Sequence, residues 1–312
     1  MIEAYGDLGT NTFHQIIMHR HSDSTYTVLD YRVEFVKLMH ESTEFLSEAA
    51  AQRAFAVLEH YAQLHSQFQV ERVCWCATEG LRRLDSNMQF QNAILNTLHI
   101  RIQLISGQEE ARLIADSLAA CVLPSTAFLG FDIGGGSTEL IAQLPGNERI
   151  MRSFPMGAAI LFKTFHKSDP IQAQEIAEMQ AYIHSHLQAF KQLLAAHQQF
   201  DFAVGSSGSL DSVLEILHFP QAEAEIFGEQ AYADIKRADL IAVKDALIPL
   251  DLPARLKVKG LLDKRAEMMP AALILADAIL ETFEIDSLRV SQFSLLKALV
   301  ETQYFNQIQA CQ

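Results

Sequence analysis

Basic residues are scarce in this chain, which has 24 Lys and Arg against 38 Asp and Glu among its 312 residues and a formal net charge of −14. Nonspecific adhesion to nucleic acids and to anionic membranes depends on Lys and Arg, because these side chains neutralise phosphate groups. The shortage of base therefore excludes both as general partners. We expect neither nucleic-acid binding nor membrane binding.

Long apolar runs are also missing. No segment approaches the roughly 18 uninterrupted apolar residues that a membrane-spanning helix needs. The first seven residues, Met-Ile-Glu-Ala-Tyr-Gly-Asp, carry acid where a secretory signal carries base, and they contain no apolar region. We therefore expect a protein that is neither exported nor embedded in a membrane.

Cysteine is sparse, with four in the chain, which is too few for a disulfide scaffold. Cys74 and Cys76 flank Trp75 in an apolar stretch that is typical of a strand. Alternate residues of a strand point to the same face, so we expect both thiols to pack in the core rather than to bind a metal. A reduced, cytoplasmic compartment fits this cysteine usage.

The overall composition is that of a folded protein, with 49% hydrophobic and 20% charged residues. A chain of this length predicts about two domains, at roughly 150 residues each. Strand-like and helix-like stretches alternate along the chain. This alternation predicts an α/β architecture with mixed sheets.

An internal echo indicates where the domains divide. Residues 5–12 read Tyr-Gly-Asp-Leu-Gly-Thr-Asn-Thr, and residues 131–138 read Phe-Asp-Ile-Gly-Gly-Gly-Ser-Thr. Each ends an apolar strand with Asp and a glycine turn, and each is followed by a second strand-like stretch, so we expect two related halves. We place the domains at 1–123 and 124–296, with a final helix at about 297–312 that can pack back on the first.

Three consecutive glycines, Gly134, Gly135 and Gly136, and then Ser137 follow the predicted strand 127–133. Glycines expose backbone N–H groups and let a ligand approach the main chain, and this suits a phosphate. The alternative is a plain hairpin turn, although three glycines are more than a tight turn needs. The spacing fits neither the dinucleotide-binding motif nor the P-loop.

Carboxylates stand on either side of this turn, Asp132 before it and Glu139 after it. Acidic side chains beside a phosphate are explained if Mg²⁺ bridges them to the phosphate oxygens, because this cation prefers hard oxygen ligands and keeps several waters. For Glu139, a solvated charge on a hairpin is the alternative interpretation.

A second Gly/Ser loop, Gly205-Ser206-Ser207-Gly208-Ser209, joins a predicted strand to a predicted helix. The N-terminus of a helix offers unpaired N–H groups and a positive dipole, which together attract anions. An N-cap by Ser207 or Ser209 explains the same residues without a ligand. The loop is therefore a candidate phosphate contact with a structural alternative.

Taken in chain order, these segments resemble the exopolyphosphatase and guanosine pentaphosphate phosphatase family (Ppx/GppA), a branch of the actin, hexokinase and Hsp70 superfamily. The stretches that carry the resemblance are 7–14, 77–82 followed by Asn87, 105–113, 132–140, 156–157 and 205–209. The resemblance implies two actin-like (ribonuclease H-like) domains with mixed sheets and a cleft between them.

The resemblance also implies roles for individual residues. Glu110, the second Glu of a Glu-Glu pair at a helix start, is expected to be the general base that deprotonates the attacking water. Asp132 and Glu139, with Asp7 as a further candidate, are expected to hold Mg²⁺ (or Mn²⁺). The residues expected to contact phosphate are Thr10, Asn11, Arg82, Gly134, Gly135, Gly136, Ser137, Gly205, Ser207, Gly208 and Ser209.

The sequence departs from the family pattern at two places. Glu79 and Gly80 replace the small residues that usually precede Leu-Arg, and we expect the charge of Glu79 to be unfavourable near a phosphate. Near the C-terminus, residues 293–298 replace a Gly-Leu-Arg-Glu-Gly stretch.

A basic cluster stands apart from these motifs. Five of the 24 basic residues, including Arg255, Lys257 and Lys259, lie in an 11-residue window with one acid. A polyanionic chain can be held by such a cluster electrostatically. We therefore interpret these three residues as a candidate polyphosphate track, with an ordinary solvated surface as the alternative.

The main hypothesis is an exopolyphosphatase, a phosphoanhydride hydrolase that removes terminal phosphate from inorganic polyphosphate. The alternative is the same chemistry on guanosine pentaphosphate (pppGpp), from which the enzyme removes the terminal 5′ phosphate. A non-catalytic phosphate or nucleotide sensor is a hypothesis of a different class. The sequence leaves chain-length preference and a homodimer open.

Overall fold

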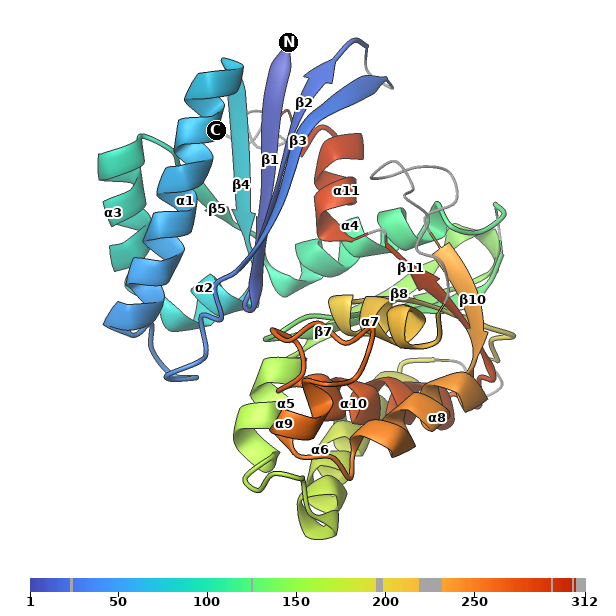
Figure 1. Ribbon diagram of the computed structural model, residues 1–312. Helices are drawn as coiled ribbons and strands as arrows, with labels where there is room; N and C mark the ends of the chain where they lie inside the picture. The colour runs from blue at the N-terminus through green and yellow to red at the C-terminus, as the bar shows by residue number, and fades with distance from the viewer. Residues whose placement is uncertain are drawn as a thin grey trace. The chain divides into compact units, whose positions relative to one another are not determined.

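The structure is a computed structural model that describes residues 1–22, 25–124, 126–194, 199–218, 232–292, 294–304 and 306. The chain divides into two compact units, one formed by Met1–Leu113 with Leu295–Gln312 and the other by Ile114–Ser294. Each unit carries one sheet with helices against it (Figure 1). The predicted α/β architecture with mixed sheets is confirmed. None of the helices in the described segments has the length and apolar character needed to cross a membrane.

The sheet of the first unit has the strand order β3-β2-β1-β4-β5. Its strands are β1 (Ile2–Leu8), β2 (Thr12–Arg20), β3 (Tyr26–Phe35), β4 (Arg72–Ala77) and β5 (Ile102–Leu104). The first three strands form antiparallel pairs, whereas β1, β4 and β5 run parallel. The helices of this unit are α1 (Glu48–Phe68), α2 (Glu79–Leu84), α3 (Gln89–Leu98), the start of α4 (Gly107–Ala119), and α11 (Leu295–Glu301).

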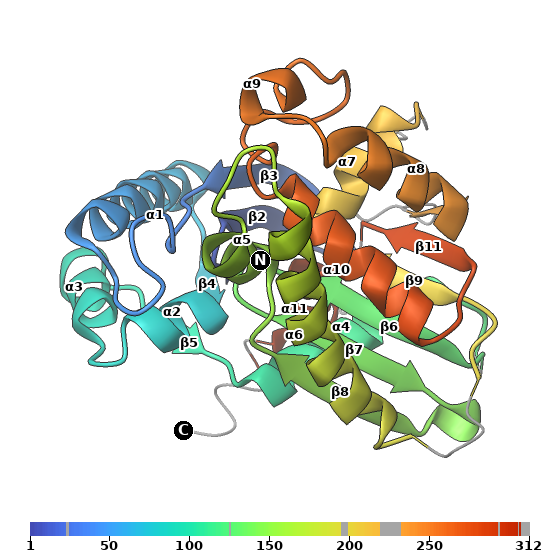
Figure 2. The same ribbon diagram turned by 90° about the horizontal axis from the view of Figure 1, so that it is seen from below.

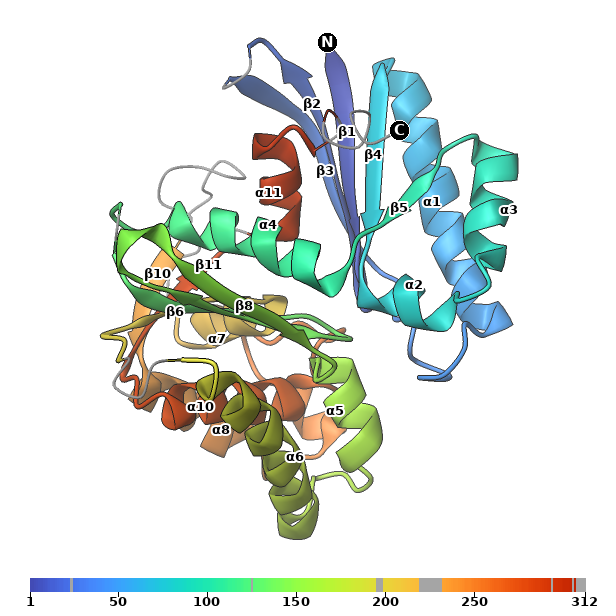
Figure 3. The same cartoon turned by 180° about the vertical axis from the view of Figure 1, so that it is seen from behind.

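Helix α1 covers one face of this sheet (Figure 3). Its Tyr61 hydroxyl donates to the carbonyl of Phe13 at 3.0 Å. The buried Gln15 Oε1 accepts from His65 Nε2 of α1 at 2.8 Å and from Trp75 Nε1 of β4 at 3.1 Å. These bonds satisfy polar groups that would otherwise be costly to bury.

The opposite face carries α11 and the two strand cysteines. Arg20 Nη2 of β2 donates to the carbonyl of Val300 at 3.0 Å, which ties α11 to the sheet. Cys74 and Cys76 are both buried, with their Sγ atoms 3.8 Å apart. The prediction that these thiols pack in the core is confirmed. The last part of the expected final helix, 307–312, lies outside the described residues.

The sheet of the second unit has the order β10-β11-β9-β6-β7-β8. The strands are β6 (Phe128–Ile133), β7 (Thr138–Gln143), β8 (Arg149–Phe154), β9 (Ala203–Ser206), β10 (Tyr232–Lys236) and β11 (Ser287–Ser291). Strands β6, β9 and β11 run parallel, and β7, β8 and β10 pair antiparallel with their neighbours. The sheet is therefore mixed, like that of the first unit.

The helices of the second unit pack mainly on one face of its sheet (Figure 2). They are α5 (Ala158–Phe165), α6 (Ala173–Lys191), α7 (Gly208–Ile216), α8 (Arg237–Leu247), α9 (Leu252–Arg255) and α10 (Met269–Thr282), with a short 3-10 turn at Pro145–Asn147. Helix α10 is apolar on nearly all sides and contacts α5, α6, α7 and α8. A helix of that composition belongs in a core.

The internal echo corresponds to a repeated hairpin. In the first unit the N–H of Gly9 donates to the carbonyl of Thr12 at 3.0 Å, and in the second the N–H of Gly134 donates to that of Ser137 at the same distance. In both units the strand before the turn pairs antiparallel with the next strand and parallel with a later one. The repeat in sequence is thus a repeat in topology.

Candidate active site

A polar cluster in the first unit centres on Arg82 of α2. Its Nη2 donates to Glu79 Oε2 at 2.9 Å, and both terminal nitrogens contact Glu110 Oε2, at 3.2 and 3.3 Å. Nη1 also donates to the carbonyl of Ile105. The Glu110 side chain is only 7% exposed, against 21% for Arg82. The structure therefore places the predicted base directly against the predicted phosphate contact.

The start of α4 explains why only one of the two adjacent glutamates faces Arg82. Ser106 Oγ accepts from the N–H of Glu109 at 3.1 Å and caps the helix. Glu109 pairs with Arg112 at 2.8 Å, and this pairing lowers its pKa. Successive helical residues point about 100° apart, so Glu110 is directed to a different partner, Arg82.

The first hairpin turn lies against the N-terminus of α2. A Cβ at Gly80 would lie 2.9 Å from Thr10 Cα and 3.0 Å from Thr10 Oγ1, so the absent side chain permits this contact. The carbonyls of Thr10 and Asn11 accept backbone N–H groups of Val36 to Leu38. The departure at Gly80 therefore has a packing reason.

In the second unit, the paired strands bring five polar residues into one row across the sheet. Ser206, Asp132, Glu139 and Ser153 stand opposite one another on β9, β6, β7 and β8, and Ser291 of β11 continues the row. Residues that are directly opposite share a face of the sheet. The two predicted metal carboxylates are therefore immediate neighbours.

Serine hydroxyls hold both carboxylates of this row. Ser206 Oγ donates to Asp132 Oδ1 at 2.6 Å, and Ser153 Oγ donates to Glu139 Oε1 at 2.7 Å. Glu139 is 1% exposed, so the interpretation of it as a solvated hairpin charge is wrong. Sequence reasoning missed the role of both serines, because it depends on strand register.

Burial disfavours the charged form of two carboxylates in this unit, Asp132 and Asp211. Desolvation raises the pKa of Asp132 to about 6, the hydrogen bond from Ser206 opposes this rise, and the charge of Asp211 adds to it. Desolvation likewise raises the pKa of Asp211 to about 6, against the influence of Arg265. Asp211 and Arg265 were not among the predicted site residues.

The glycine loop 134–136 is anchored by the start of α5. The N–H groups of Ala158 and Ala159 donate to the carbonyls of Gly134 and Gly135, both at 2.9 Å. A Cβ at Gly157 would lie 2.4 Å from the backbone of Gly135, so only glycine fits there. The carbonyls of Gly134 and Gly135 are thus occupied, and the N–H of Gly134 is bonded to Ser137. The part of the loop that suits an anion is therefore its remaining N–H groups.

The second Gly/Ser loop is in part a helix cap. Ser207 Oγ accepts from the N–H groups of Ser209 and Leu210 at 3.0 and 3.1 Å, so the expected N-cap at Ser207 is present. A Cβ at Gly208 would lie 2.0 Å from Arg265 Cζ. The absence of that Cβ lets the guanidinium lie against the first turn of α7, where an anion is favoured.

The residues present fit the predicted Mg²⁺. This ion is usually held by one or two carboxylates together with water and substrate phosphate oxygens, and Asp132 and Glu139 supply two carboxylates side by side. Within the segments that the structure describes, no group of three or more His, Cys, Asp or Glu side chains has the geometry to hold a metal by itself. Asp7 belongs to the other unit.

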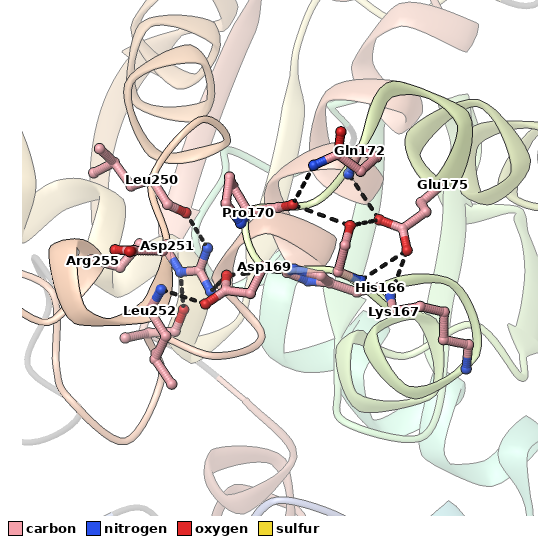
Figure 4. A network of polar contacts seen from close by, with 12 residues as sticks. His166, Lys167, Asp169, Pro170, Gln172, Glu175, Leu250, Asp251, Leu252 and Arg255 are labelled. Atoms are coloured by element: carbon pink, nitrogen blue, oxygen red, sulfur yellow. Dashed lines mark hydrogen bonds and ion pairs between the residues drawn. The ribbon is translucent and has the colours of Figure 1, made fainter.

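The candidate polyphosphate track needs one correction. Arg255 is 1% exposed and donates to the carbonyls of Leu250 and Ala266 and to Asp169 Oδ1, at 2.6, 2.9 and 2.8 Å (Figure 4). Its donors serve the fold, so it is not a surface contact for a polyanion. Lys257 and Lys259 are exposed. The spacing of the basic residues in the sequence could not show that Arg255 would be buried and paired with the distant Asp169.

This correction predicts a difference in stability between Arg255→Ala and Lys257→Ala. Removing the buried Arg255 leaves the carbonyls of Leu250 and Ala266 without this donor, and a buried polar group that loses its partner costs about 1–3 kcal/mol. The exposed Lys257 is expected to cost less than about 0.5 kcal/mol. Urea unfolding of the two variants measures this, and equal midpoints would show that Arg255 has no structural role.

Asp211 predicts a pH-dependent change. An unfolded Asp loses its proton near pH 3.9, whereas the folded one keeps it to about pH 6, so the stability of the native protein falls as pH rises through this window. Asp211→Asn is therefore expected to unfold at a higher urea concentration than the native protein at pH 8. Its free energy of unfolding should be higher by up to about 3 kcal/mol. The advantage should disappear near pH 4, and the exposed Asp263→Asn is the control.

Comparison with known proteins places this geometry in a family. The model of the Ppx/GppA phosphatase family matches residues 17–300. The guanosine-5'-triphosphate,3'-diphosphate pyrophosphatase of Vibrio vulnificus is 29% identical over 300 residues, which are 94% of this chain and 57% of that protein. The protein of the same name from Vibrio parahaemolyticus is 28% identical over 298 residues, with the same coverage. The chain thus spans little more than half the length of these curated relatives.

Solved structures show the same fold. An exopolyphosphatase from Cytophaga hutchinsonii has a TM-score of 0.86 and 24% identity, with 98% of each chain covered. The Ppx/GppA family member of Aquifex aeolicus has a TM-score of 0.77 and 23% identity, also with 98% of each chain covered. Because the family model extends over most of its length, the chain belongs to the Ppx/GppA phosphatase family.

Proposed function

We propose that this protein is a phosphoanhydride hydrolase that removes terminal orthophosphate from inorganic polyphosphate. The observation that supports this most is the buried carboxylate of Glu110, held in place by both terminal nitrogens of Arg82. Hydrolysis of a phosphoanhydride needs a positioned water and charge neutralisation rather than a covalent nucleophile. A fixed carboxylate beside a guanidinium can supply the first and part of the second.

The proposed reaction is a direct displacement by water. Glu110 takes a proton from the water while the water oxygen bonds to the terminal phosphorus. The bridging P–O bond breaks, and the shortened chain leaves with the electron pair. Arg82 orients Glu110 and, through its planar donors, can bind phosphate oxygens in pairs. The turn that contains Thr10 and Asn11 is proposed to contact phosphate as well.

The second unit, taken by itself, is proposed to bind phosphate through a metal ion and backbone N–H groups. Asp132 and Glu139 would hold Mg²⁺ or Mn²⁺, with Ser206 and Ser153 keeping the two carboxylates in place, as outer-shell partners of a metal site commonly do. The ion would supply positive charge to the phosphate oxygens. The N–H groups of the 134–137 loop and the 205–209 loop offer further contacts to phosphate.

A second candidate substrate is guanosine pentaphosphate. The two Vibrio relatives carry the name of an enzyme that acts on this nucleotide, and the chemistry at its terminal phosphoanhydride is the same. The proposed residues act on a terminal phosphoanhydride in either molecule. A non-catalytic sensor remains the alternative of a different class, and the cytoplasmic location, the homodimer and the track of Lys257 and Lys259 stay predictions.

Glu110→Gln tests the proposed base. The substitution keeps the size and the contact with Arg82 but removes the proton acceptor, so phosphate release is expected to fall by at least about 100-fold. Release should be measured side by side from long-chain polyphosphate and from guanosine pentaphosphate, with native protein and variant. Unchanged rates, or loss with one substrate only, would contradict Glu110 as a shared general base, and an inactive native protein would favour the sensor.

A further inference from the structure

Glu79 is a second carboxylate on Arg82, and nothing in the proposed reaction requires it. It lies at the first residue of α2, three positions before Arg82, and its Oε2 accepts from Nη2 at 2.9 Å. This is shorter than either contact of Arg82 with Glu110, at 3.2 and 3.3 Å. Glu79 therefore makes the shortest carboxylate contact at the proposed phosphate-binding arginine.

The donors on the two terminal nitrogens of Arg82 are all used in this arrangement. The two terminal nitrogens of a guanidinium carry four N–H groups, and here they make four contacts: one with the carbonyl of Ile105, two with Glu110 and one with Glu79. A phosphate that gains a paired grip on these nitrogens must displace one of the carboxylates.

Exposure indicates which carboxylate gives way. The side chain of Glu110 is 7% exposed and that of Glu79 is 21% exposed. Moving Glu79 into water costs little, because partly exposed ion pairs contribute little to stability. Moving the more deeply buried Glu110 would also remove the proposed base. The displaced residue is therefore Glu79.

The charge of the cluster also requires that one carboxylate moves when substrate binds. One guanidinium faces two carboxylates, Glu79 and Glu110, so the cluster carries an excess negative charge. A polyanion approaching Arg82 is repelled until one carboxylate moves away.

We propose that Glu79 is an intramolecular competitor of the substrate, occupying on Arg82 Nη2 the place of a phosphoryl oxygen and thereby lowering affinity for phosphate chains. The proposal rests on the proposed function, because it assumes that Arg82 binds substrate. It makes Glu79 a determinant of KM rather than of the chemical step.

Binding of imidotriphosphate, a tripolyphosphate analogue whose P–N–P bridges resist hydrolysis, tests this when measured by calorimetry at fixed Mg²⁺ and ionic strength. Glu79→Gln is expected to lower Kd by about fivefold, the value of one partly exposed ion pair. Steady-state kinetics should show a matching fall in KM with kcat nearly unchanged. The control is Glu59→Gln, which makes the same change of charge at an exposed position of α1 and should alter neither constant.

A double-mutant cycle assigns the effect to Arg82. In the Arg82→Ala background, Glu79→Gln should change Kd by less than half as much as in the native background, because the competitor then has nothing to occupy. Weaker or unchanged binding by Glu79→Gln would overturn the proposal and make Glu79 a residue that orients Arg82. Absence of imidotriphosphate binding in every variant would contradict the proposed function itself, and with it this proposal.

Discussion

The pairing of β6 with β7 is the constraint on which the second unit depends, because it sets Asp132 directly opposite Glu139. Desolvation raises the pKa of Asp132, and the charge of Asp211 adds to this rise. Its neighbour Glu139 is almost fully buried. Ser206 and Ser153 relieve part of this cost through short hydrogen bonds. A strained acidic pair that persists in a fold is expected at a functional site rather than in a purely structural one.

The first unit also buries a carboxylate, and there an arginine side chain balances its charge. There Arg82 balances Glu110, and Glu79 adds a further negative charge. Both units contain the same kind of hairpin, in which an Asp precedes a glycine turn closed by one backbone hydrogen bond. In the second unit this hairpin carries the paired carboxylates, whereas Arg82 and Glu110 of the first unit lie on α2 and α4. The protein thus combines fixed acids with a small number of placed donors, which explains how a chain with a net charge of −14 can be suited to an anionic substrate.

Local sequence patterns were sufficient to predict the features that depend on a few neighbouring residues. The glycine turns, the N-cap at Ser207 and the buried strand cysteines follow from residue type and spacing. Contacts between distant segments could not be predicted in this way. Ser206 meets Asp132 across 74 residues and Arg255 meets Asp169 across 86, so strand register and tertiary packing decided both. The contact between Glu79 and Arg82 is local, since the two residues lie three positions apart in α2.

The proposed function depends on attack by water at the terminal phosphorus rather than at a phosphorus within the chain. Hydrolysis of tripolyphosphate in H₂¹⁸O, followed by ³¹P NMR, tests it, because an ¹⁸O atom bonded to phosphorus shifts the resonance. We predict one ¹⁸O atom in each released orthophosphate and none in the pyrophosphate left behind. Label in the pyrophosphate would place the attack on the wrong phosphorus, and no release at all would contradict a hydrolase.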